Sequence, residues 1–238
     1  MSTVFFSVNM SLDGYIAPDG MDIEHANDPS YRDWLARWMG LQAWTFRQQF
    51  FRENLRLGDG GETGRDNDLL ERTYTRTGAT ILGKRMFDGG EQFWPEEAPF
   101  HTPVFVLTTQ LRPPWPRPGG TVFHFVNDGI HSALRQAHSA AAGRDVRIGG
   151  GAETIGQFLN AGLVDEFTIS ITPVLLGDGI RLLNQVDPRR VALEIIDVTH
   201  SPLVSHLHYR VTDTGERSPA SRTAARSEFC DHASAPSP

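Results

Sequence analysis

The chain has 238 residues, of which 39% are hydrophobic, and a formal net charge of −7 at pH 7. This length allows one large domain or two small ones, and an acidic chain without a block of basic residues argues against nucleic acid as a partner. The single cysteine, Cys230, excludes an intrachain disulfide and fits the reducing cytoplasm. No apolar run approaches the ~20 residues that cross a bilayer. We therefore expect a soluble cytoplasmic protein without a membrane segment.

The first half of the chain alternates short apolar strands with helical segments. Strands are predicted at Val4–Met10 and Ala79–Leu82, and helices at Asp33–Leu41 (with Asp28, Pro29 and Asp33 as capping residues), Trp44–Leu55, Asp66–Thr75 and Lys84–Asp88. Asp66 or Asn67 is the expected cap of the third helix. Turn signals place a loop at Ser11–Gly20, and glycine and polar residues place another at Leu57–Asp66. Pro95–Pro103 is predicted to be irregular.

The second half continues this alternation and ends in two strands. Strands are predicted at Val104–Leu107, Thr121–Val126, Asp145–Ile148, Val164–Leu176, Val191–His200 and Val204–Val211, helices at Ile130–Ala142 and Glu153–Ala161, and a proline-rich loop at Arg112–Gly120. The pattern predicts an α/β fold whose mixed, mostly parallel sheet is flanked by helices and carries antiparallel edge strands at its C-terminal end. Residues 1–212 form the expected single domain. Residues 213–238 are rich in Ser, Ala, Pro and Arg, which predicts a disordered tail.

Three consecutive glycines, Gly149 to Gly151, separate a predicted strand from a predicted helix. Glycine loses the most backbone entropy on folding, so such a run suits a turn where the backbone must approach a ligand closely. The N–H groups that begin the following helix favour an anion such as a pyrophosphate. Strand, turn and helix together indicate a nucleotide-phosphate site, and a plain tight turn is the alternative.

Five motifs follow one another in a fixed order: Ser11–Ala17 (SLDGYIA), Ile81–Met86 (ILGKRM), Val106–Thr109 (VLTT), Ile148–Gly151 (IGGG) and Gly162–Glu166 (GLVDE). In this order they resemble the dihydrofolate reductase-like family, on the branch of the riboflavin-biosynthesis reductase (RibD) C-terminal domain. The resemblance covers roughly Val4–Val211. It implies a sheet flanked by helices and an NADPH molecule bound across the carboxyl ends of the strands.

The resemblance also implies which residues hold the cofactor. The glycine run and the first turn of the next helix would contact the pyrophosphate or the nicotinamide ribose through Gly149, Gly150, Gly151, Ala152, Glu153, Thr154 and Ile155. An unusual peptide geometry between two of these glycines is common in the family. Flavin in the same site, or NADH in place of NADPH, stays open.

Two further segments extend the implied cofactor site. The turn of Gly83, Lys84, Arg85 and Met86 would contact phosphate, although Met86 stands where many related reductases carry a small hydroxyl residue. Thr108 and Thr109 would approach the adenine ribose, where Arg112 could add charge for a 2′-phosphate. The alternatives are a solvated basic pair at Lys84–Arg85 and ordinary threonines at the end of a strand.

The loop Ser11–Ala17 would close over the nicotinamide, with Ile16 and Ala17 near its ring and carboxamide. An apolar loop excludes water from the reactive ring. Asp13 and Tyr15 are the candidate catalytic residues, because either could orient the substrate or relay a proton, and water is the other possible donor. An Asp before Gly also makes an ordinary Asx turn.

Dihydrofolate reductases bind their pteridine through an acidic residue on the first long helix, which here falls within Tyr31–Phe51. The acids at its ends, Asp33 and Glu53, are not convincingly in register, so folate reduction is not implied. Three aromatic residues are instead candidates for stacking a flat heterocycle: Trp38, Phe93 and Trp94. Aromatic residues at helical spacing are also typical of a core.

The leading hypothesis is an NADPH-dependent reductase that transfers hydride to a C=N or C=O group of a small flat heterocycle, such as a pteridine, an aminopyrimidine or a specialised metabolite. The alternative is a non-catalytic NADP(H)-binding module. A metal site at His200, His206 and His208 is a third hypothesis, but no carboxylate-rich set accompanies these residues, so no metal is expected. Members of the family often form homodimers, and Val164–Leu176 with the final hairpin is the expected surface.

Overall fold

The computed structural model describes residues 2–22 and 24–212, so the predicted tail lies outside the described residues. The helices are α1 (Pro29–Arg47), α2 (Gln49–Asn54), α3 (Arg65–Arg76), α4 (Lys84–Glu91), α5 (Ile130–Ala140) and α6 (Ala152–Ala161), with a 3-10 turn, η1, at Pro118–Gly120. The strands are β1 (Val4–Ser11), β2 (Tyr15–Ala17), β3 (Thr77–Gly83), β4 (Pro103–Leu107), β5 (Trp115–Pro116), β6 (Val122–Val126), β7 (Asp145–Gly150), β8 (Glu166–Thr172), β9 (Ile180–Arg181), β10 (Ala192–His200) and β11 (Ser205–Thr212).

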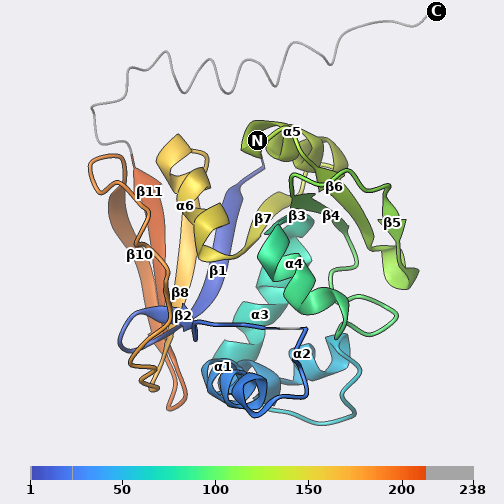
Figure 1. Ribbon diagram of the computed structural model, residues 1–238. Helices are drawn as coiled ribbons and strands as arrows, with labels where there is room; N and C mark the ends of the chain where they lie inside the picture. The colour runs from blue at the N-terminus through green and yellow to red at the C-terminus, as the bar shows by residue number, and fades with distance from the viewer. Residues whose placement is uncertain (1, 23, 213–238) are drawn as a thin grey trace, which may run out of the picture.

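The described residues form a nine-stranded sheet with the order β10-β11-β8-β1-β7-β3-β4-β6-β5. Strands β8, β1, β7, β3, β4 and β6 are parallel, whereas β11, β10 and β5 run antiparallel to their neighbours. In Figure 1 the β10–β11 hairpin forms one edge of the sheet, β5 forms the other, and β1 runs downward from the N-terminus. The predicted mixed, mostly parallel α/β sheet with an antiparallel C-terminal edge is confirmed.

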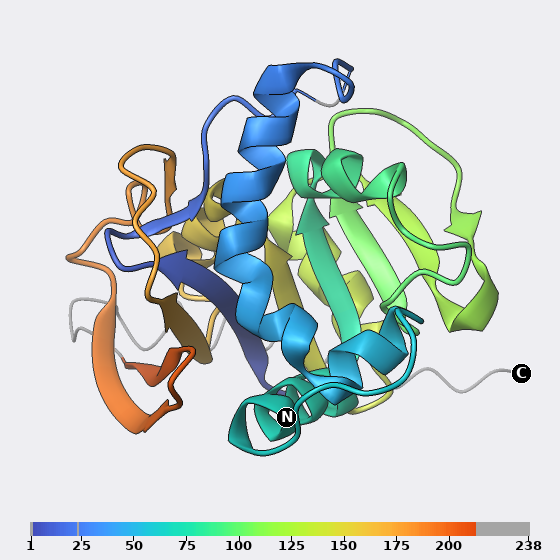
Figure 2. The same cartoon turned by 90° about the horizontal axis from the view of Figure 1, so that it is seen from below.

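Helices cover both faces of the sheet because alternate residues of each strand point to opposite faces. Val4 and Phe6 of β1 pack in the main core with residues of α5 and α6. On the opposite face Asn9 donates hydrogen bonds to α1, and the guanidinium of Arg76 on α3 lies 4.1 Å from the ring centroid of Phe5. Figure 2 shows α1 lying across this second face of the sheet.

The apolar interior divides into a main core and a smaller aromatic core. Phe6 and Phe167 stack in the main core with ring centroids 4.5 Å apart. The smaller core surrounds the fully buried ring of Phe87 on α4, which contacts Phe123 and Phe125 edge to face. Burial of large aromatic side chains contributes about 2–3 kcal/mol each, so this core fixes α4 against β3, β4 and β6.

Helix boundaries differ from the sequence predictions where distant segments meet. One helix continues to Arg47 and breaks at Gln48, whose ψ of 136° is extended, because the next backbone N–H pairs with Glu62. The cap of α3 is Gly64. The two predicted capping residues turn inward instead, where Asp66 bonds Ser201 and His206, and Asn67 accepts the N–H of Phe50.

Two strand predictions also need correction. The strand expected at Val164–Leu176 is shorter, because the chain turns out of the sheet after Thr172 and Asp13 holds the backbone N–H groups of Leu176 and Gly177. The loop predicted at Ser11–Gly20 contains β2, which pairs with β9 in a small second sheet. Both differences arise from the contact between these loops, which no local pattern encodes. The loop predicted at Arg112–Gly120 also contains regular structure, because β5 pairs with β6 and η1 follows it.

Candidate active site

The glycine run lies where β7 ends and α6 begins. The peptide bond between Gly150 and Gly151 is cis, which is the unusual geometry expected from the resemblance. Gly150 has a φ of +121°, a backbone angle that residues other than glycine rarely adopt. A Cβ on Gly151 would meet nothing within 4 Å, so the turn has open space beside it. Gly150 is buried and Gly151 is half-buried, so it is the backbone of Gly151 that is open to a ligand approaching this edge of the sheet.

Two helices begin at this edge with glycine caps. Gly151 precedes α6 and Gly83 precedes α4, and neither helix has a side-chain hydrogen bond at its N-terminus. The first N–H groups of a helix have no partner within the helix and carry partial positive charge. With no side chain to cap them, these groups fit the oxygen atoms of a phosphate or pyrophosphate.

The structure brings Gly83 and Thr154 of the predicted set into direct contact. Leu82 pairs with Gly150, so the end of β3 lies beside the glycine turn. A Cβ on Gly83 would clash with the hydroxyl oxygen of Thr154, whose side chain is buried. Gly83 is thus required for the close approach of the two helix N-termini, whatever contact it makes with phosphate.

The three residues after Gly83 lie in different environments. Lys84 forms an ion pair with Asp88 one turn along α4, and Arg85 is exposed. Met86 is 44% exposed, and its sulfur lies 3.9 Å from the position of a Cβ on Gly150. Met86 therefore covers the glycine turn from the α4 side, with a flexible apolar side chain.

The threonines that follow β4 remain compatible with both interpretations. The Thr108 hydroxyl accepts the backbone N–H of Gln110, and Thr109 is exposed. Arg112 pairs with Glu91, and its guanidinium lies 4.6 Å from the ring centroid of Phe125. Arg112 is thus held against the aromatic core on the α4 side of β6.

Asp13 joins two loops. Its carboxylate accepts hydrogen bonds from the Ser11 hydroxyl at 2.5 Å and from the backbone N–H groups of Gly177 and Leu176 at 2.7 and 3.1 Å. These donors, the Ser11 hydroxyl first, lower the pKa of Asp13 to about 2. An ionised carboxylate of this kind positions the loop and has no proton to give at neutral pH.

Tyr15 is the second candidate catalytic residue. It lies on β2, where its hydroxyl oxygen accepts a hydrogen bond of 2.9 Å from Arg181 on β9. The Arg181 guanidinium also lies 4.4 Å from the Tyr15 ring centroid. Ile16 packs against the main core, so the loop is anchored on the sheet side.

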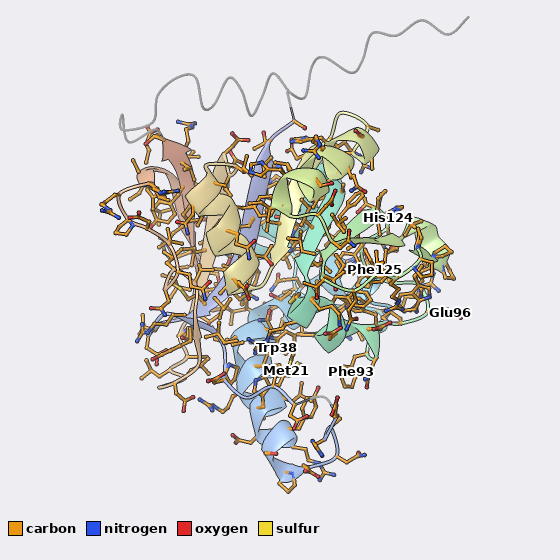
Figure 3. All side chains as sticks on the ribbon, turned by 45° about the horizontal axis from the view of Figure 1, so that its top comes forward. Met21, Trp38, Phe93, Glu96, His124 and Phe125 are labelled. Carbon is orange, nitrogen blue, oxygen red and sulfur yellow. The ribbon has the colours of Figure 1, made fainter. Side chains whose placement is uncertain are left out.

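The three candidate stacking residues separate into two groups. Trp38 begins a row of nearly parallel rings that continues through Trp34 and Tyr31 to Phe93, with centroid distances of 6.1, 5.8 and 6.3 Å. Figure 3 shows Trp38 on α1 and Phe93 after α4 on the same side of the molecule. The structure corrects the prediction for Trp94, whose ring stacks on Phe123 in the aromatic core.

Sequence reasoning missed a polar cluster between α1 and β1. Asn9 donates hydrogen bonds to Gln42 at 2.5 Å and to Thr45 at 3.1 Å. Trp38, Gln42 and Thr45 follow the i, i+4, i+7 spacing of one helix face. That spacing is visible in the sequence, but neutral side chains at helical spacing carry no signal that separates a binding site from an ordinary helix face.

The predicted histidine cluster forms a separate buried network. His206 is 3% exposed and is joined to Ser170 at 2.8 Å and to Asp66 at 3.2 Å. Burial lowers the pKa of His206 against the opposing effect of Asp66. Since a carboxylate only accepts, the neutral ring donates to Asp66 and accepts from the Ser170 hydroxyl.

A cavity of about 450 Å³ lies beside this network. Its lining comes from α3, β1, β8, β10 and β11 and includes Arg65, Asp68, Arg72, Arg76, Glu166, Asp197, His206 and His208. None of the predicted cofactor residues contributes to it, and its charges are of both signs. In residues 2–22 and 24–212 no group of three His, Cys, Asp or Glu side chains is placed to hold a metal ion, and no helix there is long and apolar enough to span a membrane.

The model of the RibD C-terminal domain matches residues 2–207, and the chain therefore belongs to this family. Two uncharacterized proteins of Bacillus subtilis (strain 168) are similar in sequence. YyaP is 40% identical over 73 residues, and YwjB is 36% identical over 62 residues. These matches cover 31% and 26% of this chain and little more than a third of each relative, at 38% and 35%.

Several solved structures share the fold. A protein of Shewanella sp. PV-4 provisionally assigned to riboflavin biosynthesis is 20% identical with a TM-score of 0.60, over 89% of this chain and 99% of that one. The deaminase/5-amino-6-(5-phosphoribosylamino)uracil reductase of Thermotoga maritima is 13% identical with a TM-score of 0.53, over 89% of this chain and 57% of that one. Enterococcus faecalis dihydrofolate reductase, complexed with NADP(H), is 13% identical with a TM-score of 0.50, over 89% of this chain and 97% of that one. The chain therefore has the dihydrofolate reductase-like fold.

Proposed function

We propose that the protein is an NADPH-dependent reductase whose cofactor lies across the carboxyl ends of β3, β4 and β7. The observation that carries this proposal is the close approach of two glycine-capped helix N-termini, which the absence of a side chain at Gly83 permits beside Thr154. The unpaired N–H groups there fit a pyrophosphate. The E. faecalis dihydrofolate reductase, which has the same fold, is complexed with NADP(H).

Each part of the site has a role in this proposal. When bound, NADPH supplies the hydride. The glycine turn and the first turn of α6 bind the pyrophosphate, Met86 and the Ser11–Ala17 loop exclude water, and Asp13 holds that loop in place. Because Asp13 stays ionised, Tyr15 or a water molecule is the proposed proton donor.

The substrate class that we propose is a small flat heterocycle with a C=N or C=O group. The aromatic row that ends at Trp38 gives a surface on which such a ring can stack. The T. maritima neighbour is named for the reduction of an aminouracil, which is a heterocycle of this kind. A pteridine or a specialised metabolite would fit the same chemistry.

Loss of NADPH absorbance in the presence of a panel of carbonyl and imine heterocycles tests this function. We expect turnover with at least one compound, and we expect a Tyr15→Phe variant to lose most of the rate while it still binds NADPH. Tight NADPH binding without turnover of any compound would favour the alternative, a non-catalytic NADP(H)-binding module.

We further propose a homodimer, in the cytoplasm that the single cysteine favours. The edge strand β10 exposes an apolar stripe on one face: Leu193 (46%), Ile195 (62%) and Val198 (53%). An exposed apolar edge strand is a surface that proteins normally cover, and symmetric dimers are the commonest assemblies. Sedimentation should give a dimeric mass for the wild type and a monomeric mass for Ile195→Glu. A monomeric wild type would contradict this proposal.

A further inference from the structure

The C-terminal half of β1 lies at a break in the sheet beside the glycine turn. Strand β1 pairs with β7 only from Val4 to Phe6, whereas its pairing with β8 continues to Ser11. Beyond Phe6 the β7 side of β1 is thus not paired within the described sheet. Asn9 lies in this segment and reaches across to α1.

The cluster of Asn9, Gln42 and Thr45 leaves two polar atoms without a partner in the described structure. Asn9 uses both of its amide hydrogens, on Gln42 and Thr45, which leaves its carbonyl oxygen free. Gln42 accepts through its carbonyl oxygen, which leaves its NH2 group free. Neither free atom is among the fully buried, unsatisfied side-chain atoms of the described residues, and both residues are half-buried.

These two free atoms are one hydrogen-bond acceptor and one donor on adjacent side chains. Reversing both amides would exchange the roles of the two residues and would again leave one donor and one acceptor. The pair is neutral, and the acid on α1 is Asp33, which is exposed near the start of the helix. The cluster therefore offers two neutral hydrogen bonds and no charge.

Trp38 lies one helical turn before Gln42 on the same face of α1. One side of its ring stacks on Trp34 at an interplanar angle of 8°, and among the described residues no other aromatic ring stacks on it. Trp38 is half-buried, so part of its surface is accessible. Because Gln42 follows Trp38 on the same helix face, a flat ring that stacks on Trp38 would have its edge near the free NH2 group of Gln42.

We propose that Asn9 and Gln42 are specificity-determining residues that form hydrogen bonds with the polar edge of the substrate ring; this inference rests on the proposed function. A lactam, with adjacent N–H and C=O groups, matches the free acceptor and donor in two hydrogen bonds. A protonated amidine presents only donors and positive charge, which favour a carboxylate. A site built for hydrogen bonds rejects a ring whose polar edge does not match it. The reductase would thus select neutral lactam heterocycles over cationic ones.

Two flat bicyclic probes of similar size test this selection: quinazolin-4(3H)-one, a neutral lactam, and 2,4-diaminoquinazoline, which is readily protonated. Calorimetric titration of the NADP+-loaded protein should show at least tenfold tighter binding of the lactam. Gln42→Leu should weaken lactam binding at least tenfold. Gln42→Glu should reverse the preference, because it introduces the missing charge.

The control variant is Gln136→Leu on α5, where the amide also bonds a hydroxyl, that of Ser132, on the opposite face of the sheet. It should bind the lactam as the wild type does. Preference of the wild type for the diamino probe, binding of neither probe, or unchanged lactam binding by Gln42→Leu would overturn the inference while NADPH binding remained intact. Failure of the wild type to bind NADPH would instead contradict the proposed function.

Discussion

Two polar regions of the molecule differ in how their hydrogen bonds are satisfied. In the network of α3, β8 and β11, Asp66 binds His206 and Ser201, and His206 also binds Ser170. At the carboxyl edge, where the parallel strands end, the N-termini of α4 and α6 meet beside the glycine turn, and the Asn9–Gln42 cluster keeps two free atoms.

We interpret this as a difference between polar groups that stabilise the fold and polar groups that are free to bind a ligand. A buried polar group costs about 1–3 kcal/mol when it lacks a partner, so proteins pair such groups wherever nothing else requires them. The network around His206 resembles a catalytic constellation in composition, but Asp66, His206 and Ser170 are buried, Ser201 is half-buried, and all four are hydrogen-bonded to one another. The carboxyl edge has the opposite character, and that is why we place the reaction there.

The largest effect should come from breaking the satisfied network. Asp66→Ala leaves the buried His206 nitrogen and the Ser201 hydroxyl without their acceptor. We expect a loss of about 3 kcal/mol in the free energy of unfolding, measured by urea denaturation, and unchanged NADPH affinity of the folded protein.

Asp68→Ala is the matched control, because Asp68 lies on the same helix and is exposed. It should change stability by less than about 1 kcal/mol. If Asp66→Ala weakened NADPH binding while the protein remained folded, the two regions would be coupled and the comparison would fail.

A smaller loss of stability, with a loss of binding, should follow when the contact at the carboxyl edge is overpacked. In Gly83→Ala the new methyl group clashes with the Thr154 hydroxyl. We expect a loss of about 2 kcal/mol in stability and at least tenfold weaker NADPH binding, because the two helix N-termini separate. Thermal unfolding and fluorescence titration measure these two effects.

The double variant Gly83→Ala/Thr154→Ala distinguishes this cause from a general effect of the substitution. Removing the hydroxyl leaves the Thr154 Cβ at 3.6 Å from the added methyl group, which is an ordinary contact. Stability should recover, and NADPH affinity should recover with it in part. If the second substitution restored nothing, the contact that we describe would not explain the first.

The smallest effect concerns Glu166 at the amino end of β8. His208, whose Nε2 lies 3.6 Å from the carboxylate, and Arg76, which donates a hydrogen bond to it, lower the pKa of Glu166 to about 2 from an ordinary 4.5, against the opposing effect of burial. The resulting stabilisation of about 1 kcal/mol is complete above pH 4.5 and is lost as the pH falls toward 2. Glu166→Gln should remove this part of the pH dependence in urea denaturation.

Glu194→Gln is the control for this pH dependence, because its ion pair with Arg210 is exposed on both sides. This variant should keep the wild-type decline in stability as the pH falls from 4.5 toward 2. A Glu166→Gln variant with the full wild-type decline would show that Glu166 is not the group responsible.

The fold was predictable because it depends on local patterns. Alternating strands and helices, and the glycine that ends α6 at Gly162, are visible in the sequence and appear in the structure. The break at Gln48 and the inward turn of Asp66 were not predictable, because each depends on a partner far along the chain, Glu62 or His206. Long-range pairing of this kind has no periodic signal.

The candidate site divides in the same way. The glycine turn and Gly83 follow from motif and spacing, and the structure brings them together. The position of Trp94 in the aromatic core could not be foreseen, because an aromatic residue in a loop has the same local pattern whether it packs or binds. The role of Asp13 in joining two loops depends on Leu176 and Gly177, more than 160 residues away.

The most direct test of the central claim is a parallel titration with NADPH and NADH, followed by tryptophan quenching and by energy transfer to the nicotinamide. We expect tight binding with a preference for NADPH in the wild type, and at least tenfold weaker binding in Gly83→Ala. Absence of binding to either cofactor would contradict the reductase assignment and leave only the fold.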